Sequence, residues 1–141
     1  MCVGKIKEKY LNELINDYLM RLRKYTKVEI VELKDCPVHK EEIDSILKVI
    51  NKNDFNIALD LKGRMLDSIE FASLIDKTLI HNSNITFIIG PSLGLNNDII
   101  KECNYVLSFS DLTFPHGLFR GILLEQIYRC FKIINNESYH K

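Results

Sequence analysis

The spacing of apolar residues predicts that helices and strands alternate along the chain. Between residues 5 and 24, apolar side chains recur every three or four positions, which is the period of an amphipathic helix. Short continuous apolar runs such as 85–89 are typical of strands buried on both faces. The pattern predicts helices at 5–24, 40–50, 68–80, 95–102 and 117–134, and strands at 28–33, 55–59, 85–89 and 105–109.

Buried strands that alternate with helices indicate an α/β sandwich built on a parallel sheet. No repeat, low-complexity stretch or Pro/Gly-rich linker interrupts the pattern, so we expect a single domain over residues 1–141. Lys62-Gly63 is expected to turn the chain after the second strand. Ligands of such folds bind at the carboxyl ends of the strands. The candidate loops are therefore those after Leu59, Ile89 and Phe109.

Composition places the chain among ordinary globular proteins, with 46% hydrophobic and 27% charged residues. No apolar run reaches the roughly 18 residues that span a bilayer, and no signal peptide precedes the first helix. We therefore expect a cytoplasmic protein without a membrane partner. The four cysteines are scattered and are expected to be free thiols. Cys36 and His39 form a lone half-site, and without a second pair we expect no metal.

Net charge is zero, but the charges are unevenly distributed. Residues 1–27 carry a net charge of +4 and residues 115–141 carry +2, which leaves −6 for the middle of the chain. Two basic ends could form one positive face for a phosphate backbone. The same pattern is also compatible with ordinary solvated helix surface, and charge alone does not decide between the two.

The loop Gly90-Pro91-Ser92-Leu93-Gly94 follows a predicted strand and precedes a predicted helix. Glycine lets a backbone approach a ligand closely, and a helix N-terminus offers free N–H groups. The loop is neither a phosphate-binding loop nor a dinucleotide fingerprint, because the residues that define those motifs are missing. Many such turns simply connect two elements, so this loop alone is a weak signal.

The segment Phe109–His116 mixes Ser and Thr hydroxyls with apolar Leu and Phe side chains, and Pro115 stiffens its exit. An adenosyl group needs this combination, because its ring face fits an apolar slot and its ring edges need polar partners. A plain entry into the last helix would explain the same residues, and physical reasoning alone favours that simpler interpretation.

Four stretches of the chain, in order, resemble the ribosomal RNA large-subunit methyltransferase H family of the SPOUT superfamily. The first three stretches are Val3–Tyr10, Ala58–Gly63 and Ile89–Leu95. The fourth and most specific is the C-terminal block, which consists of Leu107–His116, Arg120, Leu124–Arg129 and Tyr139–Lys141. The resemblance covers essentially the whole chain.

The resemblance implies a three-layer α/β/α sandwich with a C-terminal trefoil knot, and a homodimer. It also implies methyl transfer from S-adenosylmethionine to N3 of a pseudouridine in large-subunit ribosomal RNA, free or in the assembled ribosome. No metal is implied. Carried over position by position, the cofactor contacts are Leu59, Gly90, Phe109, Ser110, Asp111, Leu112, Thr113 and Phe114.

The sequence departs from the family pattern at two places. The family usually has two adjacent glycines at the start of the glycine loop, and here the second is Pro91, which lacks an N–H. Family members also carry several residues of a first strand before the Val3-Gly4-Lys5 segment, whereas Met1 and Cys2 alone precede it here. We therefore expect this strand to be truncated, or the natural start to lie upstream.

Four C-terminal residues are candidates for the chemistry. Arg120 is assigned to phosphate contact or anion stabilisation, since cationic donors could stabilise the imide anion of the target base. His116 and His140 are candidates for a base or an RNA contact, and Tyr139 could stack on a base. Glu125 and the neighbouring Gln126 are expected to pack or to form a dimer contact.

Two other classes of function fit the same residues. In one, Pro91 prevents the loop from binding the cofactor, and the protein binds RNA without methylating it. In the other, the chain is a generic nucleotide-binding α/β protein, which would bind ATP as well as it binds S-adenosylmethionine.

Overall fold

The computed structural model describes residues 1–140; Lys141, the last residue of the C-terminal motif, lies outside the described residues. The helices are α1 (Lys9–Leu22), α2 (His39–Val49), α3 (Ser68–His81), α4 (Asn97–Lys101) and α5 (His116–Ile134). The strands are β1 (Cys2–Val3), β2 (Glu32–Leu33), β3 (Phe55–Met65), β4 (Ile85–Ile89) and β5 (Tyr105–Ser108). The chain divides into two compact units, which are described separately.

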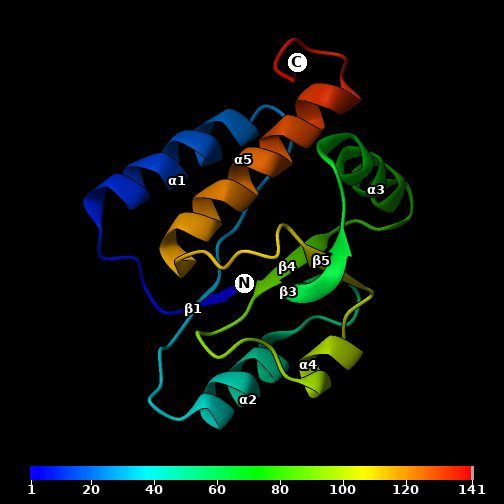
Figure 1. Ribbon diagram of the computed structural model, residues 1–141. Coiled ribbons are helices and arrows are strands. Elements are labelled where there is room, and N and C mark those ends of the chain that lie inside the picture. Colours follow the sequence, from blue (N-terminus) through cyan, green and yellow to red (C-terminus); the bar gives the residue numbers. More distant parts are fainter. Residues whose placement is uncertain (141) are drawn as a thin grey trace. The chain divides into compact units, whose positions relative to one another are not determined.

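The first unit contains the sheet and is made of residues 1–5, 30–65 and 78–113. All strand pairs are parallel, in the order β2-β1-β4-β3-β5. Figure 1 shows β4, β3 and β5 side by side. The predicted α/β class with a parallel sheet is confirmed. The trefoil knot and the single domain stay predictions.

A short first strand is present despite the short N-terminal segment. β1 lies between β2 and β4, and the N-terminal amino group of Met1 donates to the Phe87 carbonyl at 2.8 Å. The Ile89 N–H donates to the Met1 carbonyl at 3.0 Å. Because β1 has only two residues to pair, β2 is limited to Glu32–Leu33 instead of the predicted 28–33.

The core of this unit lies where α2 and α4 meet β4. Ile43 and Ile46 of α2 pack with Ile88 of β4 and Ile99 of α4, and all four are at most 3% exposed. Figure 1 shows α2 and α4 next to each other. The apolar period that predicted helix 40–50 therefore marks the face that this core buries.

β3 is longer than predicted, and the expected turn at Lys62-Gly63 is wrong. The strand continues to Met65, and Leu59 and Arg64 both pair with Leu107 of β5. Residues 60–63 therefore form a bulge inside a continuing strand. A glycine among charged residues is also typical of a turn, which is why the sequence pattern predicted one here. At Gly63 the two backbones are very close, since an added Cβ would lie 2.5 Å from the Leu107 carbonyl carbon.

We expect Gly63→Ala to destabilise the protein by about 2–3 kcal/mol. The added methyl group would collide with backbone atoms of β5, which cannot move aside by changing a side-chain rotamer. Urea unfolding measures the change. Lys62→Ala is the matched control, since Lys62 is exposed in the same bulge and should change stability by less than about 0.5 kcal/mol. Equal stability of the Gly63→Ala and Lys62→Ala variants would contradict the close approach.

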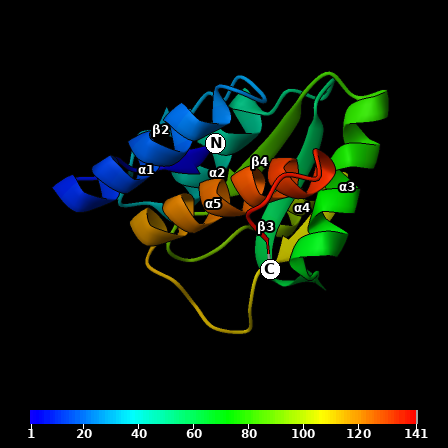
Figure 2. The ribbon, with the colours of Figure 1, turned by 90° about the horizontal axis from the view of Figure 1, so that it is seen from above.

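The second unit comprises residues 6–29, 66–77 and the chain from Phe114 onward. It holds α1, most of α3, and α5; Figure 2 shows α1 and α5 running next to each other in the same direction. Two glycines of α5 allow this close packing. An added Cβ at Gly117 would lie 2.8 Å from Leu11 Cδ1, and one at Gly121 would lie 2.6 Å from Leu14 Cδ2.

Candidate functional site

The candidate cofactor loops meet at one edge of the sheet in the first unit. Leu59 of β3 is paired with Ile89 of β4 on one side and with Leu107 of β5 on the other. Gly90 follows directly after β4, and the segment from Phe109 follows directly after β5. The parallel topology therefore brings Leu59, Gly90 and Phe109 to neighbouring positions, as expected for a ligand site at the carboxyl ends of strands.

The glycine loop is tightly packed on itself. Gly90 and Pro91 are buried, and the Gly94 N–H donates to the Pro91 carbonyl at 2.8 Å. An added Cβ at Gly90 would lie 2.9 Å from Leu95 Cγ and 3.1 Å from the Gly94 carbonyl carbon. The glycine is thus required by the loop itself, a reason that sequence reasoning missed when it considered ligand approach alone.

The helix after this loop is shorter than predicted. It begins at Asn97 because Asn96 caps it, with its side-chain oxygen accepting from the Ile99 N–H at 3.1 Å. Leu95, which was predicted as helical, instead belongs to the end of the glycine loop, and the helix ends at Lys101 instead of residue 102. Leu93, at the tip of the loop, is 78% exposed.

The loop after β5 uses its hydroxyl groups to shape its own backbone. The buried Ser108 hydroxyl donates to the Ser110 carbonyl at 3.2 Å, and the Ser110 hydroxyl accepts from the Leu112 N–H at 3.0 Å. Asp111 and Thr113 are exposed, and the apolar side chain of Leu112 is 71% exposed. An exposed leucine on each loop, Leu93 and Leu112, provides apolar surface of the kind an adenine face requires.

Phe114 belongs to the second unit, whereas the other seven candidate cofactor residues belong to the first. Its ring stacks on Phe119 of α5, with centroids 5.8 Å apart. Phe114 is therefore held by the start of α5.

The four candidates for the chemistry all lie in the second unit, at two ends of α5. His116 is the first residue of the helix and is half-buried, and Arg120 lies one turn later with 5% exposure. Tyr139 and His140 follow the helix and lie against its C-terminal half. The structure thus brings Tyr139 and His140 together, and His116 and Arg120 together, as two separate pairs.

The chain reverses after α5 in a well-defined helix-ending turn. Asn136 has a φ of +52°, a left-handed conformation that asparagine tolerates better than most residues. The Asn136 N–H donates to the Ile133 carbonyl at 3.0 Å, and the Glu137 N–H donates to the Lys132 carbonyl at 2.8 Å. This pair of bonds is a Schellman motif, and it directs the tail back along the helix.

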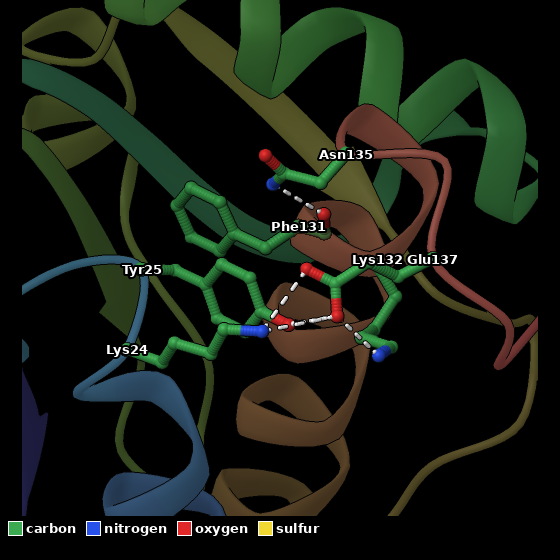
Figure 3. Close-up of polar contacts among 6 residues, drawn as sticks. All are labelled: Lys24, Tyr25, Phe131, Lys132, Asn135 and Glu137. Atoms are coloured by element: carbon green, nitrogen blue, oxygen red, sulfur yellow. Dashed lines mark hydrogen bonds and ion pairs between the residues drawn. The ribbon is translucent and has the colours of Figure 1, made fainter.

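Glu137 anchors the tail after this reversal (Figure 3). Its carboxylate accepts from Lys132 Nζ at 2.6 Å, from the Tyr25 hydroxyl at 2.9 Å and from Lys24 Nζ at 3.3 Å. Tyr25 also stacks on Phe131 with centroids 5.5 Å apart. Hydrogen bonds from Lys132 and then Tyr25 lower the pKa of Glu137 to about 2.

The lowered pKa makes the stability contribution of Glu137 dependent on pH. A carboxyl group whose pKa is lower in the folded chain stabilises it above the ordinary value of about 4.3. This contribution is lost as pH falls toward about 2. We expect the stability difference between wild type and Glu137→Gln to shrink between about pH 5 and pH 2, as measured by urea unfolding. A difference that stays constant over this range would contradict the anchor.

Tyr139 is held by four residues, among them Glu125, which was expected from the sequence to pack or to form a dimer contact. Its hydroxyl donates to Glu125 Oε1 at 3.1 Å and lies 3.5 Å from the Tyr18 hydroxyl. Its ring meets the Tyr128 ring edge-on with centroids 5.0 Å apart, and the Arg129 guanidinium lies 4.9 Å from its centroid. Burial, followed by the Tyr18 hydrogen bond, raises the pKa of Tyr139, so the hydroxyl keeps its proton.

Several basic residues in α1 and directly after it are already paired. Arg21 pairs with Asp17 at 2.9 Å, and Lys24 pairs with Glu137 at 3.3 Å. Arg23 is exposed and makes no ion pair within residues 1–140. The candidate RNA-binding face at the N-terminal end of the chain therefore offers fewer unpaired charges than the residue count suggests.

Within the part of the chain that the structure describes, no group of three His, Cys, Asp or Glu side chains could hold a metal ion. Over the same residues, no helix is both long and apolar enough to cross a membrane. The four cysteines are free thiols, as predicted, and burial raises the pKa of Cys130 to about 12 and that of Cys103 to about 11.

Comparison with known proteins decides the family. A family model described as "Predicted SPOUT methyltransferase" matches residues 1–140. The chain belongs to the SPOUT methyltransferase family.

Relatives named ribosomal RNA large subunit methyltransferase H match this SPOUT methyltransferase over nearly its whole length. The relative from Desulforamulus reducens is 48% identical over 154 residues, which cover 100% of this chain and 96% of the relative. Relatives from Clostridium acetobutylicum and Clostridium botulinum strain Hall are 45% and 49% identical over 152 residues. Each of these two alignments covers 99% of this chain and 96% of the relative. The family resemblance seen in the sequence is confirmed, and the roles of individual site residues stay predictions.

Proposed function

We propose that the protein transfers the methyl group of S-adenosylmethionine to N3 of a pseudouridine in large-subunit ribosomal RNA. The observation that carries the proposal is the 45–49% identity, over nearly the whole chain, to relatives named ribosomal RNA large subunit methyltransferase H. A protein that acts on ribosomal RNA or on assembled ribosomes works in the cytoplasm, and we propose that location.

The sheet edge of the first unit supports the assignment of the cofactor site. The family requires a methyl donor, and the segments after β4 and β5 flank Leu59 and each carry an exposed leucine, Leu93 and Leu112. The residues proposed to hold the cofactor are Leu59, Gly90 and the segment Phe109–Phe114. S-adenosylmethionine supplies an activated methyl group on a sulfonium, so the protein must mainly align the acceptor nitrogen and stabilise its anion.

Helix α5 of the second unit supports the assignment of the RNA site, with one pair of candidate residues toward each of its two ends. Arg120 and His116 lie in the first turns of α5, and Tyr139 and His140 lie on its C-terminal half. We assign Arg120 to anion or phosphate stabilisation and Tyr139 to contact with a base. His116 and His140 are assigned to contacts around the target nucleotide.

Mass spectrometry of ribosomal RNA tests the proposal. A strain that lacks the gene should lose one methylated pseudouridine from the large-subunit RNA, and a plasmid copy should restore it. The same methyl group should appear when purified protein and S-adenosylmethionine are added to ribosomes from the deletion strain. Unchanged modification in the deletion strain would reject the reaction.

Pro91 favours a second candidate, an RNA-binding protein without methyltransferase activity. Proline cannot donate an N–H at the position where the family usually has glycine, and Pro91 is buried within the loop. Calorimetry with S-adenosylmethionine and with ATP separates the candidates. Selective binding of S-adenosylmethionine supports the enzyme, and binding by the Pro91→Gly variant but not by wild type would support the second candidate.

We also propose that the protein is a homodimer, as the family resemblance implies. Light scattering is expected to give a mass of about twice the 16.4 kDa of one chain. A monomer that still methylates RNA would contradict this prediction.

A further inference from the structure

One carboxylate on α5 contacts both functional residues of the tail, directly or through one neighbour. Glu125 accepts from the Tyr139 hydroxyl at 3.1 Å and forms an ion pair with Arg129, one helical turn away. Arg129 in turn reaches the ring of His140, with 3.4 Å between its NH1 nitrogen and His140 Nδ1. The side chains of Glu125 and Arg129 are 18% and 25% exposed, so this pair is largely withdrawn from solvent.

The contact between Arg129 and His140 determines which ring nitrogen carries the proton. A guanidinium group has donors and no acceptor, so His140 Nδ1 must accept in this hydrogen bond. A neutral imidazole that accepts through Nδ1 carries its proton on Nε2. His140 is itself exposed and its contact with Arg129 uses Nδ1, so the Nε2–H is left to donate to a group outside the chain. In this arrangement the ring offers a donor and has no lone pair left to take a proton.

Tyr139 likewise keeps its proton, which it donates within the chain. Its hydroxyl already donates to Glu125, and burial favours the protonated form. The tail therefore presents two protonated groups, neither of which is set up as a base.

We infer that Glu125 and Arg129 are positioning residues that hold His140 as a hydrogen-bond donor through Nε2, so that His140 stabilises the anion of the target base instead of removing its proton. This inference rests on the proposed function for its substrate. The imide N–H of the base loses its proton to hydroxide or water, and the nitrogen lone pair then forms the new N–C bond as the C–S bond of the sulfonium breaks. His140 donates to a carbonyl oxygen next to that nitrogen throughout, and no proton leaves the ring.

The tautomer of His140 can be measured without any methyl transfer. Nitrogen-15 NMR of the histidine rings distinguishes the two neutral tautomers, and the spectrum of His140→Gln identifies the signals that belong to His140. We expect the Nε2–H form in the wild-type protein. A predominant Nδ1–H form would overturn the inference, whether or not the protein proves to be a methyltransferase.

A paired variant tests the role of the two positioning residues. Glu125→Gln combined with Arg129→Met leaves an acceptor for Tyr139 and removes both charges together, so that no buried charge is left alone. We expect this variant to show a mixture of His140 tautomers and to lose turnover more than RNA affinity. Lys52→Met combined with Glu102→Gln is the control, because it removes an ion pair that lies outside both basic ends of the chain and outside the candidate loops. An unchanged His140 tautomer in the Glu125/Arg129 variant would show that these two residues do not position His140.

Substitutions of His140 distinguish whether its side chain acts as a hydrogen-bond donor or as a base. Glutamine places an N–H close to the position of histidine Nε2 but cannot act as a base. We expect His140→Gln to keep single-turnover methyl transfer within about tenfold of wild type, whereas His140→Ala should lose about 100-fold. The rate should rise with pH in wild type and in His140→Gln alike, because the ionising group belongs to the substrate. Equal, large losses in both variants would contradict the donor role and would favour His140 as a base.

Discussion

Gly90→Val is expected to weaken the binding of S-adenosylmethionine by at least about 100-fold, a loss of about 2.7 kcal/mol of binding free energy. The added side chain would have to enter space that Leu95 and Gly94 already fill, with the first carbon 2.9 Å from Leu95 Cγ. The glycine loop must therefore move away from Leu59 and from the loop after β5. Calorimetry with the cofactor measures the loss.

Gly94→Ala is the matched control for Gly90→Val. Gly94 has a φ of +82° but nothing lies within 4 Å of an added Cβ, so alanine there adds backbone strain of about 1–2 kcal/mol without a steric collision. We expect the control to bind the cofactor more tightly than Gly90→Val does. Unchanged affinity in a folded Gly90→Val variant would remove this loop from the cofactor site.

Arg120→Ala is expected to lower the rate of single-turnover methyl transfer by about 100-fold or more, while RNA affinity falls much less. A charged donor that acts on the anion of the target base contributes mainly when that anion has formed. Filter binding and single-turnover methylation, run together, measure the two effects. Because Arg120 is only 5% exposed, thermal unfolding of the variant must be compared with wild type.

Two further variants sharpen the test of Arg120. Arg120→Lys keeps the charge and should recover part of the rate if charge is what matters. Arg23→Ala removes an exposed arginine and is expected to affect RNA affinity and its salt dependence, with the slope reduced by about one. Equal losses of affinity and rate in Arg120→Ala would make Arg120 a docking contact only.

The hydrophobic pattern predicted the elements well where neighbours in sequence decide the structure. β4 has the predicted bounds of 85–89, and the predicted helix 68–80 differs from α3 by a single residue. The pattern failed to predict the length of a strand where that length depends on the neighbouring strand in the sheet. The continuation of β3 past Gly63 depends on Leu107, more than forty residues away, and the shortness of β2 depends on the two residues of β1.

The candidate site shows the same division. That Leu59 and the loops after β4 and β5 lie at neighbouring positions follows from a parallel sheet and could be predicted, but the loop expected after Leu59 is wrong, because β3 continues to Met65. The contact between Tyr139 and Glu125 could not, because it needs the reversal at Asn136 to bring residues 14 positions apart together. The Asn135-Asn136 pair after the helix was the one available signal, since asparagine often ends a helix in the left-handed conformation.

The interleaving of the two units affects how the chain is made. α1 belongs to the unit that begins at residue 6, yet its partner α5 begins at His116. β1 must likewise wait for Ile89 before it can pair. On the ribosome, the apolar face of α1 therefore stays uncovered until α5 has been synthesised. Neither unit is a continuous fragment, and each is completed only by contacts between segments that are distant in the sequence, which slows folding.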